Sequence, residues 1–194
     1  MGVTVAVMER STSYSARMEP ATPPLDSEIQ AAIDNVMRGN PPLRLFTTLA
    51  RDKRVFTKFF GAGLLDRGHL TIRQREIIID RTTANNRAEY EWGVHVAVYA
   101  ATAGLTDEQV SSLTHGSPTD DCWTEDERAL IELCDQLHAT ATIDDELWRR
   151  LSDAFDEAAI LELLLLVGFY TTTSFIVNGL RLPLEDGVAR FSEF

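Results

Sequence analysis

Two glutamates and one histidine between residues 76 and 95 have the residue types and the spacing of an acid/base site. Glu91 and His95 are four residues apart, so on a helix they share one face, and the carboxylate can orient the imidazole or favour its protonated form. Histidine titrates near neutral pH, which suits it to proton transfer. We therefore expect His95, Glu76 and Glu91 to be the catalytic residues.

Glu76 belongs to a helix that the sequence predicts over residues 71–83, on a face that is otherwise largely apolar. A carboxylate in such a stripe is costly unless it is paired or its pKa is raised. One interpretation of Glu76 is therefore an active-site group. The alternative is a structural ion pair with a nearby arginine: Arg73, Arg75 or Arg81.

Several other side chains could form the walls of a pocket around His95. Trp92 and Tyr99 share its helix face, and two arginines of the preceding helix could hold a substrate carboxylate with two hydrogen bonds or could lie at the surface. Two polar residues of the strongly apolar segment 158–180 could line the pocket or form hydrogen bonds between packed helices. The expected substrate-binding residues are Trp92, Tyr99, Tyr90, Arg75, Arg73, Tyr170 and Asn178.

Helix signals dominate the elements that must position these groups. A threonine followed three residues later by Gln or Glu, at positions 71, 106 and 124, is typical of a capping box at a helix start. We predict an all-α fold of roughly eight helices with short connections. The expected helical ranges are 26–37, 43–50, 53–65, 71–83, 89–103, a short helix from 106, 124–138, 144–155 and 157–180.

Length and composition indicate one globular domain. The chain has 194 residues, of which 44% are hydrophobic, and we expect an N-terminal arm over residues 1–25 and a single domain over 26–194. A net charge of -12 argues against nucleic acid or anionic lipid as partners. The start of the chain does not resemble a signal peptide, so we expect a cytoplasmic protein.

The segment 158–180 approaches the length of a membrane span, but it contains Glu162, Asn178 and several threonines. We interpret it as a helix buried in the core or in a subunit interface, and we expect no membrane partner. Its apolar content exceeds what one helix of a small monomer usually buries. A homo-oligomer is therefore expected.

The two cysteines, Cys122 and Cys134, are twelve residues apart and form no CxxC pair. We interpret them as reduced, at least partly buried thiols. Cys134 and His138 could share a helix face, but a third ligand is not evident, so we expect no metal site.

The pattern Arg73-x-x-Glu76 followed by EYEWGVH at residues 89–95 resembles the carboxymuconolactone decarboxylase family, which is related to alkyl hydroperoxidase D. The segments 124–138 and 162–180 look like the later helices of the longer members, so the resemblance covers about residues 40–187. It implies an alkyl hydroperoxidase D-like helical bundle that assembles into trimers or hexamers.

In the peroxidase branch of that family, a CxxC pair lies between the glutamate and the histidine. The resemblance places the two thiol positions on Ala88 and Glu91, and peroxide reduction needs a nucleophilic thiolate and a resolving thiol. The chain therefore resembles a thiol-less branch. The decarboxylase branch, whose members resemble cofactor-free lyases acting on lactones with acidic side chains, fits it better.

Three functional hypotheses follow. The first is a cofactor-independent decarboxylase, or a related lyase, isomerase or cyclase, acting on a small carbonyl or lactone substrate. In it His95 protonates the enolate carbon, Glu91 holds the imidazole tautomer, and Glu76 orients His95 or acts as a second acid/base group. The second is a non-catalytic oligomeric binding or scaffold protein. The third is a thiol peroxidase that uses Cys122 or Cys134.

Overall fold

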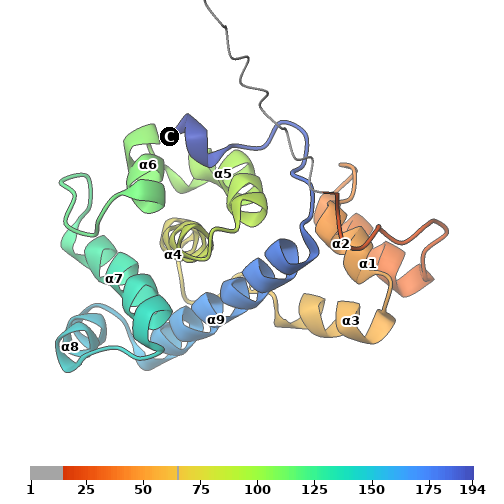
Figure 1. Ribbon diagram of the computed structural model, residues 1–194. Coiled ribbons are helices and arrows are strands. Elements are labelled where there is room, and N and C mark those ends of the chain that lie inside the picture. The colour runs from red at the N-terminus through yellow and green to blue at the C-terminus, as the bar shows by residue number, and fades with distance from the viewer. Residues whose placement is uncertain (1–14, 65) are drawn as a thin grey trace, which may run out of the picture.

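The computed structural model describes residues 15–64 and 66–194, and this part of the chain consists of helices and loops (Figure 1). The expected all-α class is confirmed: among the described residues there are nine α-helices, one at each of the nine expected ranges, and a short 3-10 helix. Residues 15–25 of the expected arm form no helix, and residues 1–14 lie outside the described residues. The helices are α1 (Ser27–Met37), α2 (Arg44–Leu49), α3 (Lys53–Ala62), α4 (Ile72–Asn85), α5 (Glu89–Ala103), α6 (Asp107–His115), α7 (Glu125–Thr140), α8 (Asp145–Ala154), α9 (Glu157–Leu180) and the 3-10 helix η1 (Phe191–Glu193).

Side-chain caps fix most of the helix starts. Capping boxes form at the starts of α4, α6 and α7, where the threonine accepts from the backbone of the residue three positions on. The ends of α3, α4 and α7 differ from expectation by two or three residues, and α7 runs to Thr140 rather than to residue 138. α4 runs beyond Thr83 to Asn85, because the amide groups of Asn86 bond to the Thr82 carbonyl, whereas α3 ends at Ala62 because Gly63 is extended.

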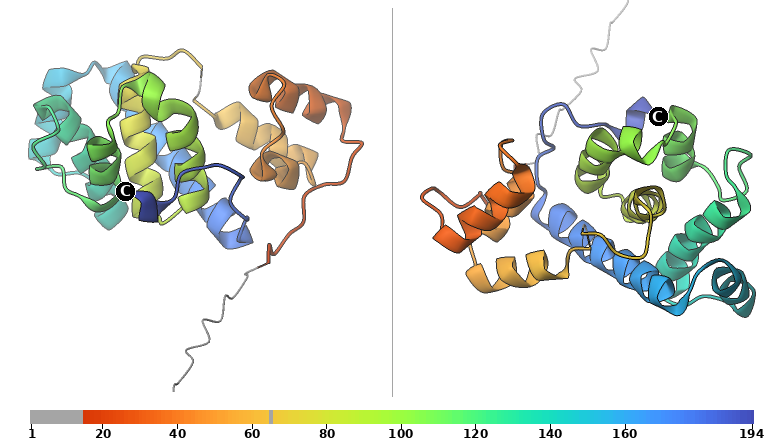
Figure 2. Two further views of the ribbon diagram at one scale, coloured as in Figure 1. Left: turned by 90° about the horizontal axis from the view of Figure 1, so that it is seen from above. Right: turned by 180° about the vertical axis from the view of Figure 1, so that it is seen from behind.

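α4 is the central helix of the larger part of the molecule. Figure 2 shows it surrounded by α5, α6, α7 and α9, and it packs against all four of them. Ile77, Ile78 and Ile79 are all fully buried, so α4 is covered on every side. Polar residues of α4 are therefore forced into the interior, which explains why Glu76 needs partners.

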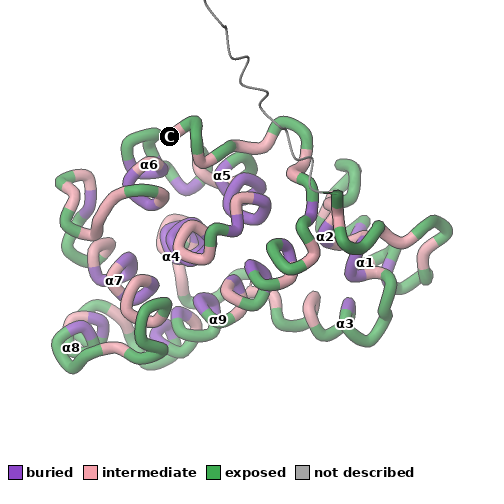
Figure 3. Tube along the Cα trace, viewed as in Figure 1, coloured by how far each residue is buried: buried purple, intermediate pink, exposed green. Residues whose placement is uncertain are grey.

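A second apolar cluster joins the N-terminal helices to the rest. Ile29, Leu45 and Phe56 of α1, α2 and α3 pack with the start of α5 and with Val177 near the end of α9. The burial pattern in Figure 3 follows these two clusters, with buried turns facing inward and exposed turns on the outer faces of the helices.

The C-terminal segment, residues 182–194, crosses the outer face of α5 (Figure 1). The side chain of Glu185 accepts hydrogen bonds from Arg44 and from Tyr90, and the rings of Phe191 and Phe194 lie 4.8 and 5.7 Å from the Trp92 ring. This crossing requires a small residue on α5, since a Cβ added at Gly93 would lie 2.5 Å from the Ala189 carbonyl oxygen.

We therefore expect Gly93→Ala to destabilise the protein by roughly 1–3 kcal/mol, because a backbone atom rather than a flexible side chain must move. Gly61→Ala is the matched control. A Cβ at Gly61 in α3 meets no atom within 4 Å, so alanine there should stabilise by about 0.5–1 kcal/mol. Urea unfolding of both variants measures the difference, and equal effects would contradict the close approach.

Candidate active site

The structure brings Glu76, Glu91 and His95 together at the contact between α4 and α5. The His95 Nδ1 atom is 2.7 Å from Oε2 of Glu76, and its Nε2 atom is 3.6 Å from Oε1 of Glu91. All three residues are buried, with exposed fractions of 0%, 7% and 4% for Glu76, Glu91 and His95. The imidazole thus lies between two carboxylates in a setting shielded from water.

This arrangement decides the protonation state of His95. Burial alone lowers the pKa of the imidazole, but the charge and hydrogen bond of Glu76, with a smaller contribution from Glu91, outweigh it and raise the pKa to about 10. His95 is therefore an imidazolium at neutral pH. Nδ1 donates a short hydrogen bond to Glu76, whereas Nε2 is held more loosely and is the nitrogen better placed to give its proton to another molecule.

The contacts of Glu76 are compatible with both interpretations of this residue, the active-site group and the structural ion pair. The Nε atom of Arg75 lies 3.3 Å from Oε1 of Glu76, so this glutamate has a structural ion pair as well as its contact with His95. Arg81 pairs instead with Asp135 on α7 at 2.6 Å. Glu76 thus bridges a guanidinium and an imidazolium, which offsets the cost of burying its charge.

Two tyrosines border His95. The Tyr99 ring lies 5.3 Å from the imidazole, and the Tyr170 ring of α9 lies 5.0 Å away at a near-perpendicular angle. Burial raises the pKa of both phenols, so both keep their protons at neutral pH. The Arg75 guanidinium lies 6.0 Å from the centre of the Tyr99 ring. Arg75 and Tyr99 are only partly buried and form the rim of the cluster.

Asp80 is a further member of this cluster that sequence reasoning missed. It lies one helical turn after Glu76, is 1% exposed, and neither of its oxygens has a hydrogen-bond partner among the described residues. Burial, reinforced by the charge of Glu76 and opposed by that of His95, raises the pKa of Asp80 well above its usual range. The available signal was its spacing of four residues from Glu76.

Two residues expected at the site have structural contacts elsewhere. Arg73 lies with its Nε atom 2.5 Å from Glu127 of α7 and donates to the Gly104 carbonyl at the end of α5. The Tyr90 hydroxyl accepts from the Leu45 amide and donates to Glu185, on the side of α5 that faces the N-terminal helices. The structure brings neither side chain to the imidazole.

Trp92 and Asn178 also have their contacts with other parts of the fold. Trp92 is fully buried beneath the aromatic rings of the C-terminal segment. Asn178 is exposed and donates to the Asn86 carbonyl just beyond the end of α4, which is the helix-packing alternative for this residue. Of the seven expected binding residues, the structure therefore places Arg75, Tyr99 and Tyr170 around His95.

The thiols are poorly suited to redox chemistry. Burial raises the pKa of the Cys134 thiol to about 12, and it also raises the pKa of the half-buried Cys122 thiol. Reactive cysteines need a lowered pKa because the thiolate is the nucleophile. Among the described residues, no group of three or more His, Cys, Asp or Glu side chains is arranged to hold a metal ion.

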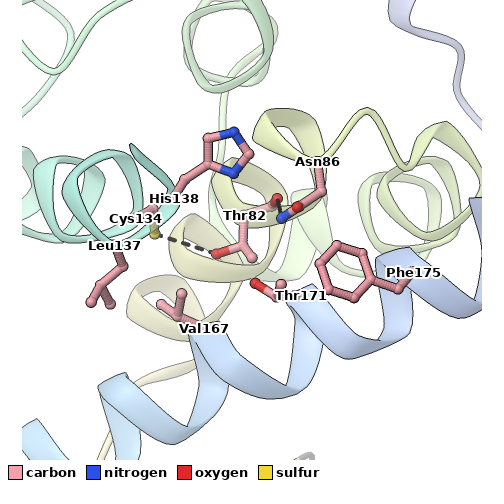
Figure 4. A pocket seen from close by; sticks show the side chains of 8 residues that line it. All are labelled: Thr82, Asn86, Cys134, Leu137, His138, Val167, Thr171 and Phe175. Carbon is pink, nitrogen blue, oxygen red and sulfur yellow. Dashed lines mark hydrogen bonds between the residues drawn. The ribbon is translucent and has the colours of Figure 1, made fainter. Parts of the chain in front are cut away.

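A cavity of about 260 Å³ lies on a different face of α4 (Figure 4). Its lining includes Thr82 of α4, Asn86 just beyond the end of α4, Cys134 and His138 of α7, and Phe175 of α9. The Thr82 hydroxyl donates to the Cys134 sulfur at 3.5 Å on its floor. The cavity faces α7 and α9, whereas Glu76 faces α5, so it is separate from the carboxylate–imidazole cluster.

Solved structures share this fold. An uncharacterized peroxidase-related protein from Silicibacter sp. TM1040 has a TM-score of 0.78 at 16% identity, covering 91% of this chain and 96% of that one. The alkylhydroperoxidase AhpD core protein from Ralstonia eutropha JMP134, an uncharacterized peroxidase-related protein, has a TM-score of 0.74 at 19% identity, covering 84% and 87%. A cysteine-to-alanine variant of the debrominase Bmp8, in complex with 2,3,4-tribromopyrrole, has a TM-score of 0.73 at 14% identity, covering 89% and 93%.

These likenesses and the helical architecture define an all-α protein with the alkyl hydroperoxidase D-like fold. The model of the carboxymuconolactone decarboxylase family matches residues 53–133, which contain Glu76, Glu91 and His95. This match agrees with the resemblance to the family that the sequence motifs indicated. No curated protein matches the sequence.

Proposed function

We propose that this protein is a cofactor-independent acid/base enzyme, a decarboxylase or a related lyase, isomerase or cyclase, acting on a small carbonyl or lactone substrate. The observation that carries the proposal is the buried imidazolium of His95 between Glu76 and Glu91. The family match supports the substrate class. We also propose that the enzyme is a cytoplasmic homo-oligomer, as its composition and its apolar C-terminal helix suggest.

In a decarboxylation, the electrons of the breaking carbon–carbon bond pass into the adjacent carbonyl and form an enolate as carbon dioxide leaves. His95 would then give its Nε2 proton to the enolate carbon, and the resulting neutral imidazole would regain a proton from solvent. Glu76 keeps the ring oriented through Nδ1. Arg75 and Tyr99, at the partly exposed rim, would direct a substrate carboxylate and the enolate oxygen.

A non-catalytic binding or scaffold role is the second candidate. It is favoured by the burial of His95, which leaves the imidazole only 4% exposed and requires the rim to open before a substrate can reach Nε2. A peroxidase is disfavoured because burial raises the pKa of both cysteines. The peroxidase-related and debrominase names of the structural neighbours describe those proteins.

The test is turnover of a panel of β-keto acids and carboxylated lactones. We expect His95→Gln to lower kcat/KM by about 100-fold or more, since a positioned proton donor typically contributes that much. Wild-type activity should fall as the pH rises through about 10, because only the imidazolium can donate. Thiol-blocking reagents should have no effect.

His138→Gln is the matched control, because His138 is exposed on α7 and lines the separate cavity. Full activity in His95→Gln would refute the catalytic assignment. If no compound in the panel is turned over and none shifts the His95 resonance in an NMR titration, the binding or scaffold role becomes the better explanation.

A further inference from the structure

α9 has apolar residues on two opposite faces. One face packs into the core through Leu163, Leu166 and Tyr170. The other is exposed along the length of the helix, where Leu161, Leu165 and Phe175 have exposed fractions of 69%, 56% and 66%. By length and composition alone α9 could cross a membrane, yet only 44% of its most apolar 18-residue window is buried in this fold.

The exposed residues of this face of α9, which lie at positions 161, 165, 168, 172, 175 and 179, follow a regular spacing. They recur at alternating intervals of four and three residues, which is the spacing of the seam between two packed helices. Contiguous exposed apolar surface of this kind marks an interaction site, whereas single exposed leucines need no explanation. The exposed stripe of α9 consists of Leu161, Leu165, Gly168, Thr172, Phe175 and Gly179.

The exposed stripe of one α9 is complementary in shape to the same stripe of a second α9 that runs in the opposite direction. A two-fold axis between Gly168 and Thr172 places Leu165 beside the partner's Phe175 and Leu161 beside the partner's Gly179. The small residues at the centre and at one end then make room for the large ones, since a Cβ built at Gly168 or Gly179 meets no atom within 4 Å. A two-fold interface requires this kind of self-complementarity.

Charge at the two ends of α9 favours the same orientation. The exposed Asp156 and Glu157 make its N-terminal end acidic. Arg17 and Arg181 make the C-terminal end basic, and Arg17 is held there because its guanidinium donates to the Gly179 carbonyl and its amide to the Leu180 carbonyl. An antiparallel pair brings opposite charges together at both ends, whereas a parallel pair would bring like charges together.

We propose that the exposed stripe of α9 binds the same stripe of a second copy of the chain in an antiparallel, two-fold symmetric pair. This pairing rests on the homo-oligomer proposed above and does not depend on the catalytic assignment. It also places the interface beside the cavity of Figure 4, because Phe175 belongs both to the stripe and to the cavity lining. The second copy therefore borders the mouth of that cavity.

Sedimentation velocity tests the pairing. We expect Leu165→Glu to halve the mass of the wild-type particle, whatever higher assembly the pairs form, because two glutamates would be buried against Phe175. Val36→Glu is the matched control: Val36 is 42% exposed on α1, which packs against α3, and its variant should keep the wild-type mass. Circular dichroism establishes that both variants are folded. An unchanged mass for Leu165→Glu would overturn the proposal.

Disulfide trapping tests the orientation in a Cys122→Ser background. The double variant Leu161→Cys, Gly179→Cys should give covalent dimers on mild oxidation, and Leu161→Cys alone should not, because only the antiparallel pair brings positions 161 and 179 within disulfide reach. Dimers from Leu161→Cys alone would indicate a parallel pair.

A vesicle-binding measurement tests the membrane as the alternative occupant of the stripe. The stripe would be assigned to a membrane instead if the wild type is monomeric in solution and binds phosphatidylcholine–phosphatidylglycerol vesicles, and if Leu165→Glu loses this binding.

Discussion

Replacing Asp80 by asparagine is expected to stabilise the protein by roughly 1–3 kcal/mol at pH 7, although most substitutions of fully buried residues destabilise. Burial raises the pKa of the Asp80 carboxyl well above its usual range, while in the unfolded chain the group ionises near pH 4. Folding above that pH must therefore keep a proton that the unfolded chain releases, and this cost grows with pH. Asparagine is similar in shape and has no proton to release.

The pH dependence distinguishes this effect from ordinary repacking. The gain from Asp80→Asn should vanish below about pH 4, where the carboxyl is protonated in both states, and should increase toward neutral pH. Urea unfolding from pH 3.5 to pH 8 measures it. Asp153→Asn is the control, since Asp153 is exposed in a surface pair with Arg149 and should change stability by less than about 1 kcal/mol. A pH-independent gain would mean that Asp80 is not the titrating group.

Glu76→Gln is expected to have the largest effect on the electrostatics of the site. Without the Glu76 charge, burial dominates, and the pKa of His95 should fall from about 10 to well below neutral unless Glu91 moves closer. NMR titration of the imidazole protons measures this directly. The loss of one partner from a buried ion pair should also cost up to about 3–5 kcal/mol at pH 6.

The stability of the wild type should depend on the same proton. Because the folded-state pKa of His95 is raised, its stabilising contribution is complete below about pH 6.5, the unfolded value, and is lost as the pH rises through about 10. Wild type should therefore lose stability between pH 7 and pH 10.5, and Glu76→Gln should lose much less. Glu132→Gln, in the half-buried pair with Arg150, should retain the wild-type profile. A His95 pKa that stays near 10 in Glu76→Gln would assign the effect to Glu91.

The centre of the site was predictable because it is local in sequence. Helical periodicity and the spacing of four residues placed Glu91 beside His95, and the Thr71 capping box fixed where α4 begins and which of its faces carries Glu76. The pairing of α4 with α5 then required only that two neighbouring helices pack together.

The features of the site that the sequence did not predict depend on contacts between segments far apart in the chain. The C-terminal segment covers Trp92 and supplies Glu185 to Tyr90, and nothing near those residues in the sequence indicates it. Asp80 was missed because amphipathic patterns assume a solvent face, whereas α4 is covered by α5, α6, α7 and α9. Arg73 was ambiguous for a similar reason, since its partner Glu127 lies 54 residues away.

The short connection between α4 and α5 has a consequence for the order of folding. It comprises residues 86–88, with Arg87 in the left-handed region and the Ala88 amide bonded to the Thr83 carbonyl, so closing it costs little chain entropy. Glu76, His95 and Glu91 can thus meet through local contacts, which form faster than distant ones. Tyr170 arrives on α9 from some 75 residues further along. The ion pairs of His95 with Glu76 and Glu91 can therefore form before α9 packs against them and excludes water.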